Sequence, residues 1–158
     1  MEQIFAELKF MTEGEGLIDI TNNLNQFIQE NNFYSGIFII TSLHTSCSLT
    51  INENADPNVL KDLKKYMQSL VPYNSYSSLS KNKDEIYYEH YQEGPDDMPA
   101  HIKTSLTNTS LSLSFRNGKI ILGTWQAIYL WEHRFSPKER SISVHIVGEK
   151  SSNIYNNR

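Results

Sequence analysis

The sequence predicts an α+β fold: one domain of mostly antiparallel, sandwich-like sheet with two main helices and one short helix. Two segments in the first half carry apolar residues at helical spacing, whereas several short segments alternate polar and apolar residues as β-strands do. Such strand segments dominate the last third, where short turns separate them and favour antiparallel pairing. The 158 residues are enough to bury one hydrophobic core. We expect this domain to span residues 1–150, with a disordered tail at 151–158.

The chain opens with a strand and an amphipathic helix. Every second residue from 4 to 10 is apolar, which predicts a strand with one buried face. A turn rich in Gly and Glu follows at residues 13–16. Helical spacing then predicts a helix that ends near Asn31 and Asn32, with its apolar stripe at Leu17, Ile20, Leu24, Phe27 and Ile28.

Two strands come next. The nearly continuous apolar run at residues 36–41 predicts a buried strand. In the strand from His44, alternation directs Cys47, Leu49 and Ile51 to the core. The opposite face, in line with His44, is small and polar: Ser46, Ser48, Thr50 and Asn52. We expect these consecutive strands to pair or to lie next to each other.

The middle of the chain is mainly helical. Asp56 followed by Pro57 is typical of an N-cap and a first helical position. The apolar stripe of this second helix is Val59, Leu60, Leu63, Met67 and Leu70. Residues 72–83 are polar and aperiodic, so we expect an exposed loop there. Residues 97–106 predict a short helix with Pro99 in its first turn.

The last third predicts strands only. Alternation at residues 110–115 and the pair Asn117–Gly118 indicate a hairpin with a type I′ turn. Its partner strand is residues 119–122. Residues 125–134 and 142–147 predict two more strands.

Composition excludes several classes of function. A formal charge of −4 argues against a general binder of nucleic acid or of anionic membranes. The first eleven residues lack the apolar core of a signal peptide, and no segment is apolar for long enough to span a bilayer. We therefore expect a cytoplasmic protein. The single cysteine, Cys47, is interpreted as a buried core residue.

Three histidines can carry chemistry. His44 stands beside hydroxyl side chains, which indicates either a polar pocket around an imidazole or a histidine that hydrogen-bonds a strand end. His90 and His101 flank a loop with three carboxylates. Imidazole and carboxylate groups ligate zinc, although the spacing matches no short metal motif. The alternative is that Asp96 and Asp97 only cap the helix.

Charged residues near the last turn have two interpretations each. Glu132 shares a face with Gln126 and with apolar residues, so it is either a general acid or base or the partner of an arginine. Arg134 and Arg140 can hold a phosphate together with the helix start at Asp97, or they are solvated surface residues.

Four blocks, in order along the chain, resemble the YjbQ-like family: His-Thr-Ser and Leu-Thr-Ile-Asn-Glu-Asn-Ala-Asp-Pro from His44, Tyr-Glu-His from Tyr88, Glu-Gly-Pro-Asp-Asp-Met-Pro-Ala-His-Ile-Lys from Glu93, and Gly-Thr-Trp-Gln-Ala-Ile from Gly123. The likeness continues through Glu132-His133-Arg134. Three features depart from the family: Ala127 where Gly is commoner, a longer loop at 73–86 and extra residues after Glu149.

The resemblance implies a compact α+β fold and a homotrimer with clefts at or near subunit boundaries. It also implies a pocket that gathers His44, His90 and His101 with Asn52 and Glu132. Members of the family are often described as secondary thiamine-phosphate synthases, which join a pyrimidine pyrophosphate to a thiazole phosphate. A transferase that acts on small phosphorylated metabolites is therefore our first hypothesis.

Each candidate residue has a role in that hypothesis. A divalent metal, zinc or magnesium, is held by His44, His90 and His101. The catalytic residues are His44, Glu132 and Asn52. Substrate and anion binding falls to Thr45, Ser46, Gln126, Arg134 and Arg140. The alternatives are a metal-dependent hydrolase and a non-enzymatic trimer that binds a small anionic metabolite. The sequence leaves open whether His133 and His145 join the site, and His145, on a strand with Ser143, is interpreted as a residue of the sheet face.

Overall fold

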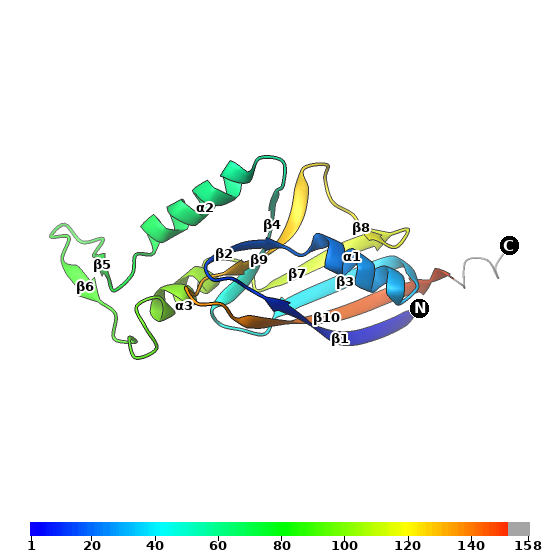
Figure 1. Ribbon diagram of the computed structural model, residues 1–158, viewed down its shortest axis with the longest axis horizontal. Coiled ribbons are helices and arrows are strands. Elements are labelled where there is room, and N and C mark those ends of the chain that lie inside the picture. Colours follow the sequence, from blue (N-terminus) through cyan, green and yellow to red (C-terminus); the bar gives the residue numbers. More distant parts are fainter. Residues whose placement is uncertain (152–158) are drawn as a thin grey trace.

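The computed structural model describes residues 1–151 (Figure 1). Within this range the chain forms three helices: α1 (Thr21–Glu30), α2 (Pro57–Leu70) and α3 (Asp97–Ser105). The strands are β1 (Glu2–Met11), β2 (Gly16–Asp19), β3 (Phe33–Ser42), β4 (Cys47–Glu53), β5 (Ser75–Ser77), β6 (Glu85–Tyr87), β7 (Ser110–Arg116), β8 (Lys119–Ile120), β9 (Gln126–Glu132) and β10 (Glu139–Lys150).

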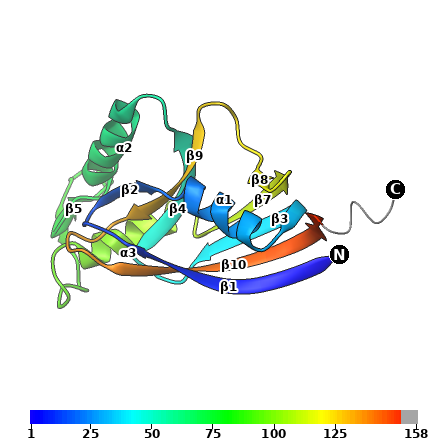
Figure 2. The ribbon, with the colours of Figure 1, turned by 45° about the vertical axis from the view of Figure 1, so that its right-hand side comes forward.

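The strands form two larger sheets and one hairpin, all antiparallel. The five-stranded sheet has the order β1-β10-β3-β7-β8, and the three-stranded sheet has the order β2-β9-β4. The short strands β5 and β6 pair only with each other. In both ribbon views α2, α3 and this hairpin lie at one end of the molecule, while the N-terminus and the end of β10 lie at the other (Figure 2).

One hydrophobic core joins both larger sheets to α1. Ile20, which follows β2, and Leu24 and Ile28 of α1 are fully buried in this core. The central strands β9 and β10 supply buried residues at Ile128, Leu130, Ile142, Val144 and Ile146. Buried and partly exposed residues alternate along most of β10. A strand is therefore the favourable conformation of this segment, because it directs the buried side chains to one face. The predicted α+β class is confirmed.

The start of the first helix was predicted wrongly. Leu17 was expected in the helix, but residues 16–19 form β2, which pairs with β9 from Gly16 opposite Glu132 to Asp19 opposite Tyr129. The apolar positions 17, 18 and 20 fit a strand as well as a helix. Pairing with the distant β9 decides between them, and the Ile20 N–H still bonds Ile128 O at 2.9 Å before the helix begins.

The two consecutive strands around His44 do not pair. β3 pairs with β10 and β7, whereas β4 pairs with β9 in the other sheet. His44 lies in the bend between them, because β3 ends at Ser42 and β4 begins at Cys47. The bend carries the chain from one sheet to the other. Cys47 and Leu49 reach the core as predicted, and Ser48 on the polar face is also fully buried.

Other segments differ from the prediction in length. The loop expected at residues 72–83 contains β5, whose three residues are too short to show a period. β8 is shorter than predicted, and β10 is longer. Asn117 and Gly118 have φ values of 55° and 70°, which confirms the type I′ turn. Of the predicted tail, Ser151 donates its N–H to Asn32 O at 2.9 Å, and residues 152–158 lie outside the described part.

The second helix begins as predicted. The Asp56 carboxylate accepts a 2.8 Å hydrogen bond from the Asn58 N–H, and Pro57 takes the first helical position. No helix within residues 1–151 is long and apolar enough to cross a membrane.

Candidate functional site

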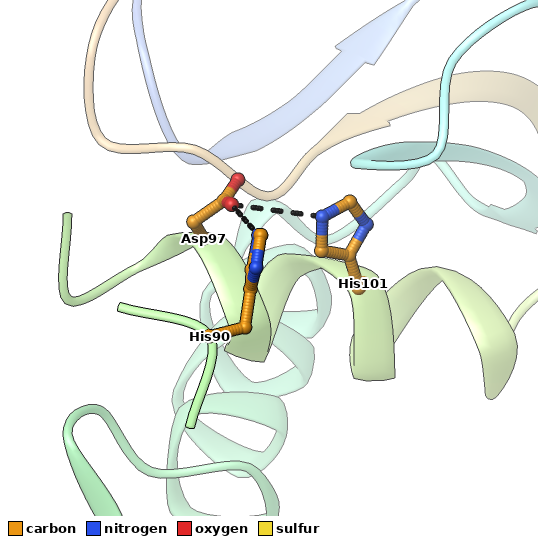
Figure 3. A group of neighbouring side chains, drawn as sticks. All are labelled: His90, Asp97 and His101. Atoms are coloured by element: carbon orange, nitrogen blue, oxygen red, sulfur yellow. Dashed lines mark hydrogen bonds and ion pairs between the residues drawn. The ribbon is translucent and has the colours of Figure 1, made fainter. Parts of the chain in front are cut away.

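Two histidines and an aspartate meet at the start of α3 (Figure 3). Asp97 and His101 stand four residues apart on this helix, so their side chains share one face. His90 approaches from the segment that follows β6. Asp97 Oδ2 lies 2.6 Å from His90 Nε2 and 3.6 Å from His101 Nε2, and the three ligand atoms all lie within 4.8 Å of one another. We call these residues the His–Asp–His group.

The surroundings of the group fix its orientation. The Asp97 side chain is only 3% exposed, and its other oxygen, Oδ1, accepts a hydrogen bond from Arg134. His101 Nδ1 lies 3.0 Å from Thr45 O. A carbonyl oxygen can only accept, so Nδ1 carries the proton and a neutral His101 presents the lone pair of Nε2 to the group. This hydrogen bond therefore prepares His101 to ligate a cation.

The donor set suits one metal better than another. Two imidazole nitrogens and one carboxylate oxygen are ligands that zinc accepts, and three protein ligands leave a coordination position open. Magnesium prefers oxygen ligands throughout. The His90 and His101 side chains are 49% and 33% exposed, so water and small molecules reach the group.

His44 does not join the other two histidines. Its Nε2 accepts a 2.8 Å hydrogen bond from the Ser141 N–H, and burial followed by the nearby Arg140 charge lowers its pKa. The structure therefore brings together two of the three predicted histidines, and Asp97 lies with them in place of His44. The four-residue spacing of Asp97 and His101 on a predicted helix was the sequence signal for this aspartate.

His44 and His101 do share a cavity of about 510 Å³. Hydroxyl side chains surround the two rings, and we call this space the His44 cavity; its lining includes Ser42, His44, Thr45, His101, Thr104 and Thr109. His90 lines a second cavity of about 470 Å³ with Tyr87 and Tyr91. The His–Asp–His group thus stands beside two accessible cavities.

Glu132 is buried and fully bonded. Its carboxylate accepts hydrogen bonds from Arg140 at 2.5 and 2.7 Å, from the Thr12 hydroxyl at 2.9 Å, and from the His133 and Arg134 N–H groups at 3.0 and 2.9 Å. Burial would raise the pKa of Glu132, but the Arg140 hydrogen bonds and the other donors together lower it. Of the two interpretations of Glu132, the geometry favours the ion pair over the general acid or base.

Both arginines are committed to carboxylates. Arg134 bonds Asp97, Asp96 Oδ2 at 3.0 Å and Glu93 O at 2.8 Å. Arg140 pairs with Glu132 and reaches Ser46 Oγ at 3.1 Å. Neither guanidinium is a free phosphate-binding group, so any anion must be held by other means.

Asp96 does not cap α3 through its side chain. Its carboxylate instead accepts the Phe135 N–H at 2.7 Å and Arg134 Nε. Burial would raise the pKa of Asp96, but these two donors lower it on balance. Asp96 thus ties the turn after β9 to the start of α3.

Asn52 and Gln126 stand outside the His–Asp–His group. Asn52 Oδ1 accepts the Glu53 N–H at 2.8 Å, and Gln126 Oε1 accepts the Gly123 N–H at 2.7 Å. Both side-chain oxygens therefore stabilise local backbone. Their cross-strand neighbours place them at the far end of the β4–β9 pair from Cys47 and Glu132.

The two histidines without a predicted role have different surroundings. His133 is fully buried, with Nε2 2.9 Å from Ser48 Oγ, and burial together with the Lys103 and Arg140 charges lowers its pKa to about 3. His145 stacks on Phe5 on the sheet surface, with ring centroids 4.0 Å apart. Neither belongs to the group.

A buried ion pair behind α3 was not foreseen. Lys103 is fully buried, and its Nζ lies 2.5 Å from Glu15 Oε1. Tyr73 and Gln68 also donate to the Glu15 carboxylate, at 2.9 and 2.6 Å. A lysine in a short polar helix carries no sequence signal of burial, so only the tertiary structure reveals this anchor.

Comparison with known proteins decides the family. The family model described as UPF0047 protein YjbQ-like matches residues 6–149. The chain belongs to the YjbQ-like UPF0047 family. Among its curated relatives, the UPF0047 protein sll1880 of Synechocystis is 41% identical over 142 residues, or 90% of each chain. The UPF0047 protein YjbQ of Salmonella typhimurium is 44% identical over 115 residues, which are 73% of this chain and 75% of that protein.

Solved structures agree with the fold of this YjbQ-like chain. A YjbQ/UPF0047 family protein from Clostridium acetobutylicum is 33% identical, with a TM-score of 0.71 over 91% of this chain and 99% of that one. The conserved hypothetical protein TT1486 from Thermus thermophilus is 29% identical, with a TM-score of 0.72 over 90% of this chain and 99% of that one.

Proposed function

We propose that this protein is a metal-dependent enzyme that acts on a small phosphorylated metabolite. The observation that supports it is the His–Asp–His group, in which two imidazoles and a buried carboxylate converge beside an accessible cavity. A divalent metal bound there would supply Lewis-acid chemistry at a phosphoryl oxygen. The donor set favours zinc over magnesium.

The reaction to test first is a transfer that joins a pyrimidine pyrophosphate to a thiazole phosphate. The family resemblance supports this choice. The roles of the residues change from the first hypothesis, because Arg140 pairs with Glu132 and Arg134 pairs with two aspartates inside the protein. His90, Asp97 and His101 would hold the metal, and neutralisation of the pyrophosphate would fall to that metal rather than to the arginines.

Metal content is the decisive measurement. We expect the purified protein to contain zinc, and His101→Ala and Asp97→Asn to lose it. His145→Ala is the matched control, because this imidazole stacks on Phe5 outside the group. Equal metal content in the control and in His101→Ala, or no bound divalent metal in any variant after zinc is supplied, would contradict the proposal.

A metal-dependent hydrolase is the second candidate. Three protein ligands with an open position for water form the usual equipment of a hydrolytic zinc site. Incubation of the protein with the two thiamine precursors and with model phosphoesters, each with and without chelator, separates the two reactions. Chelator-sensitive ester cleavage without condensation would identify the hydrolase. Recovery of every compound intact would favour the third hypothesis, a binder of a small anionic metabolite.

We also propose that the active form is a homotrimer. Phe5 and Ile37 are 70% and 50% exposed on the outer face of the five-stranded sheet. Exposure of these apolar side chains to water is unfavourable, and contact with another copy of the chain would bury them. Light scattering is expected to give about three times the 18.3 kDa chain mass. A monomeric mass at micromolar concentration would exclude this assembly.

A further inference from the structure

The His44 cavity gathers neutral hydrogen-bond donors that suit an anion. The proposed function requires the protein to bind phosphoryl oxygens, yet both candidate arginines are held by carboxylates. Phosphate oxygens are also bound by neutral N–H and O–H donors when these converge. The cavity that His101 shares with His44 is the place where such donors gather next to the His–Asp–His group.

The hydrogen bonds of His44 fix its tautomer. The Ser141 N–H donates to His44 Nε2 at 2.8 Å, so Nε2 carries a lone pair and no proton. The ring is therefore neutral, and Nδ1 carries the proton. Among residues 1–151 no acceptor bonds this Nδ1–H. His44 thus keeps one unused donor on a ring that lines the cavity.

Three hydroxyl groups of the same cavity are also unused: the buried Thr104 Oγ1 has no hydrogen-bond partner among the described residues, and two more are exposed. Thr45 and Thr109 are exposed, and their Oγ1 atoms make no hydrogen bond to any other residue that the structure describes. The Thr45 carbonyl also bonds His101, so the same residue contributes to the cavity and orients a member of the His–Asp–His group. Within the described part of the chain, no carboxylate side chain lines this cavity to repel an anion.

We propose that the His44 cavity is a phosphoryl-binding subsite in which His44 Nδ1–H and the Thr45 and Thr109 hydroxyls donate to substrate oxygens. His44 is thereby reassigned from metal ligand to substrate-binding donor. This inference deepens the proposed function and rests on it for the neighbouring metal. The ligand class is a phosphate monoester or pyrophosphate small enough for about 510 Å³.

Two substitutions at one position test the donor. His44→Gln can place its carbonyl oxygen near the position of Nε2 and still accept from Ser141, but it loses the donor at Nδ1. His44→Asn can keep an N–H near Nδ1 and loses the acceptor for Ser141. Calorimetric titration with inorganic phosphate is expected to give about tenfold weaker binding for His44→Gln than for wild type, with His44→Asn between them. Thr109→Val tests a hydroxyl without touching His44, and Thr107→Val is its control, because the Thr107 hydroxyl bonds Lys103 O instead.

The outcomes separate this inference from the proposed function. Phosphate binding that His44→Gln and Thr109→Val leave unchanged in folded, metal-bound protein would overturn the subsite while the metal centre stands. An absence of phosphate binding to wild type would overturn it as well. If the protein holds no metal but these variants still weaken phosphate binding, the subsite is supported and the metal proposal fails.

Discussion

At the scale of single residues, burial and hydrogen bonding assign the charged groups to structure or to chemistry. Glu132 and Arg140 are both buried and satisfy each other, whereas His90 and His101 remain accessible around Asp97. In a buried ion pair each residue needs its partner, because removal of one leaves an uncompensated charge in the interior and destabilises the fold. The chemistry of this protein is therefore expected at the His–Asp–His group.

Glu132→Gln is expected to destabilise the protein by about 3 kcal/mol, because it leaves the buried Arg140 guanidinium without its counter-charge. Urea denaturation measures this change in the free energy of unfolding. Glu139→Gln is the control, since Glu139 forms a 2.8 Å pair with Lys9 in which both side chains are more than half exposed. That exposed pair is expected to contribute little to stability, because water and salt screen it. Equal losses in the two variants would contradict the structural role of Glu132.

His133 is expected to make stability depend on pH. Its pKa is about 3 in the folded protein and about 6.5 when unfolded, so the unfolded state binds its proton first as the pH falls. The contribution of His133 is therefore complete above pH 6.5 and is lost progressively toward pH 3, by about 1.4 kcal/mol per pH unit. His133→Gln, which can keep a bond to Ser48, is expected to reduce this slope between pH 6 and pH 4 in urea titrations. An unchanged slope would show that His133 titrates normally.

At the scale of elements, the turn between β1 and β2 positions the Glu15 anchor. Gly14 has a φ of +114°, and a Cβ there would lie 2.3 Å from Phe135 O. Gly14→Ala is therefore expected to destabilise the protein by about 2 kcal/mol, through backbone strain and this contact. Gly16→Ala is the matched control, because no described atom lies within 4 Å of its added Cβ. Thermal melts that rank the two variants equally would contradict this account.

The elements that the sequence predicted correctly are those decided by local chemistry. The Asp56–Pro57 cap begins α2, and Asn117–Gly118 turns the chain between β7 and β8. The errors concern long-range pairing. β2 exists because β9 offers it partners, and the bend at His44 exists because β3 and β4 belong to different sheets. The spacing of apolar residues along the sequence predicts neither of these strand pairings.

The candidate site was predicted only in part for the same reason. The sequence indicated His90 and His101 as a pair near carboxylates, and these residues do lie together. The sequence placed His44 in this group instead of Asp97, because the direction of a side chain in a bend cannot be read from alternation. The saturation of Arg134 and Arg140 likewise depends on carboxylates far away in the sequence or across a turn.

At the scale of the whole molecule, the two sheets and α1 form the shared core, and the His–Asp–His group lies at the end where α2, α3 and the β5–β6 hairpin gather. The family likeness covers residues 6–149, so this frame is common to the relatives. Part of the β5–β6 hairpin lies in the loop at residues 73–86, which we expect to be longer than in most relatives. We therefore expect family members to share the core more closely than the rim of the site.

The ion pair behind α3 couples two distant parts of this molecule. His101 and Lys103 stand two residues apart on α3, one in the His–Asp–His group and the other locked to Glu15. A metal that orders this helix would therefore also stabilise the segment around Glu15. By thermodynamic linkage, a change at Glu15 would alter the metal affinity by the same free energy. Zinc is expected to slow amide hydrogen exchange at residues 12–16, and Glu15→Gln is expected to weaken zinc affinity, although Glu15 is no ligand. Unchanged hydrogen exchange at residues 12–16 on zinc binding, together with unchanged zinc affinity in Glu15→Gln, would show that α3 does not couple the two sites.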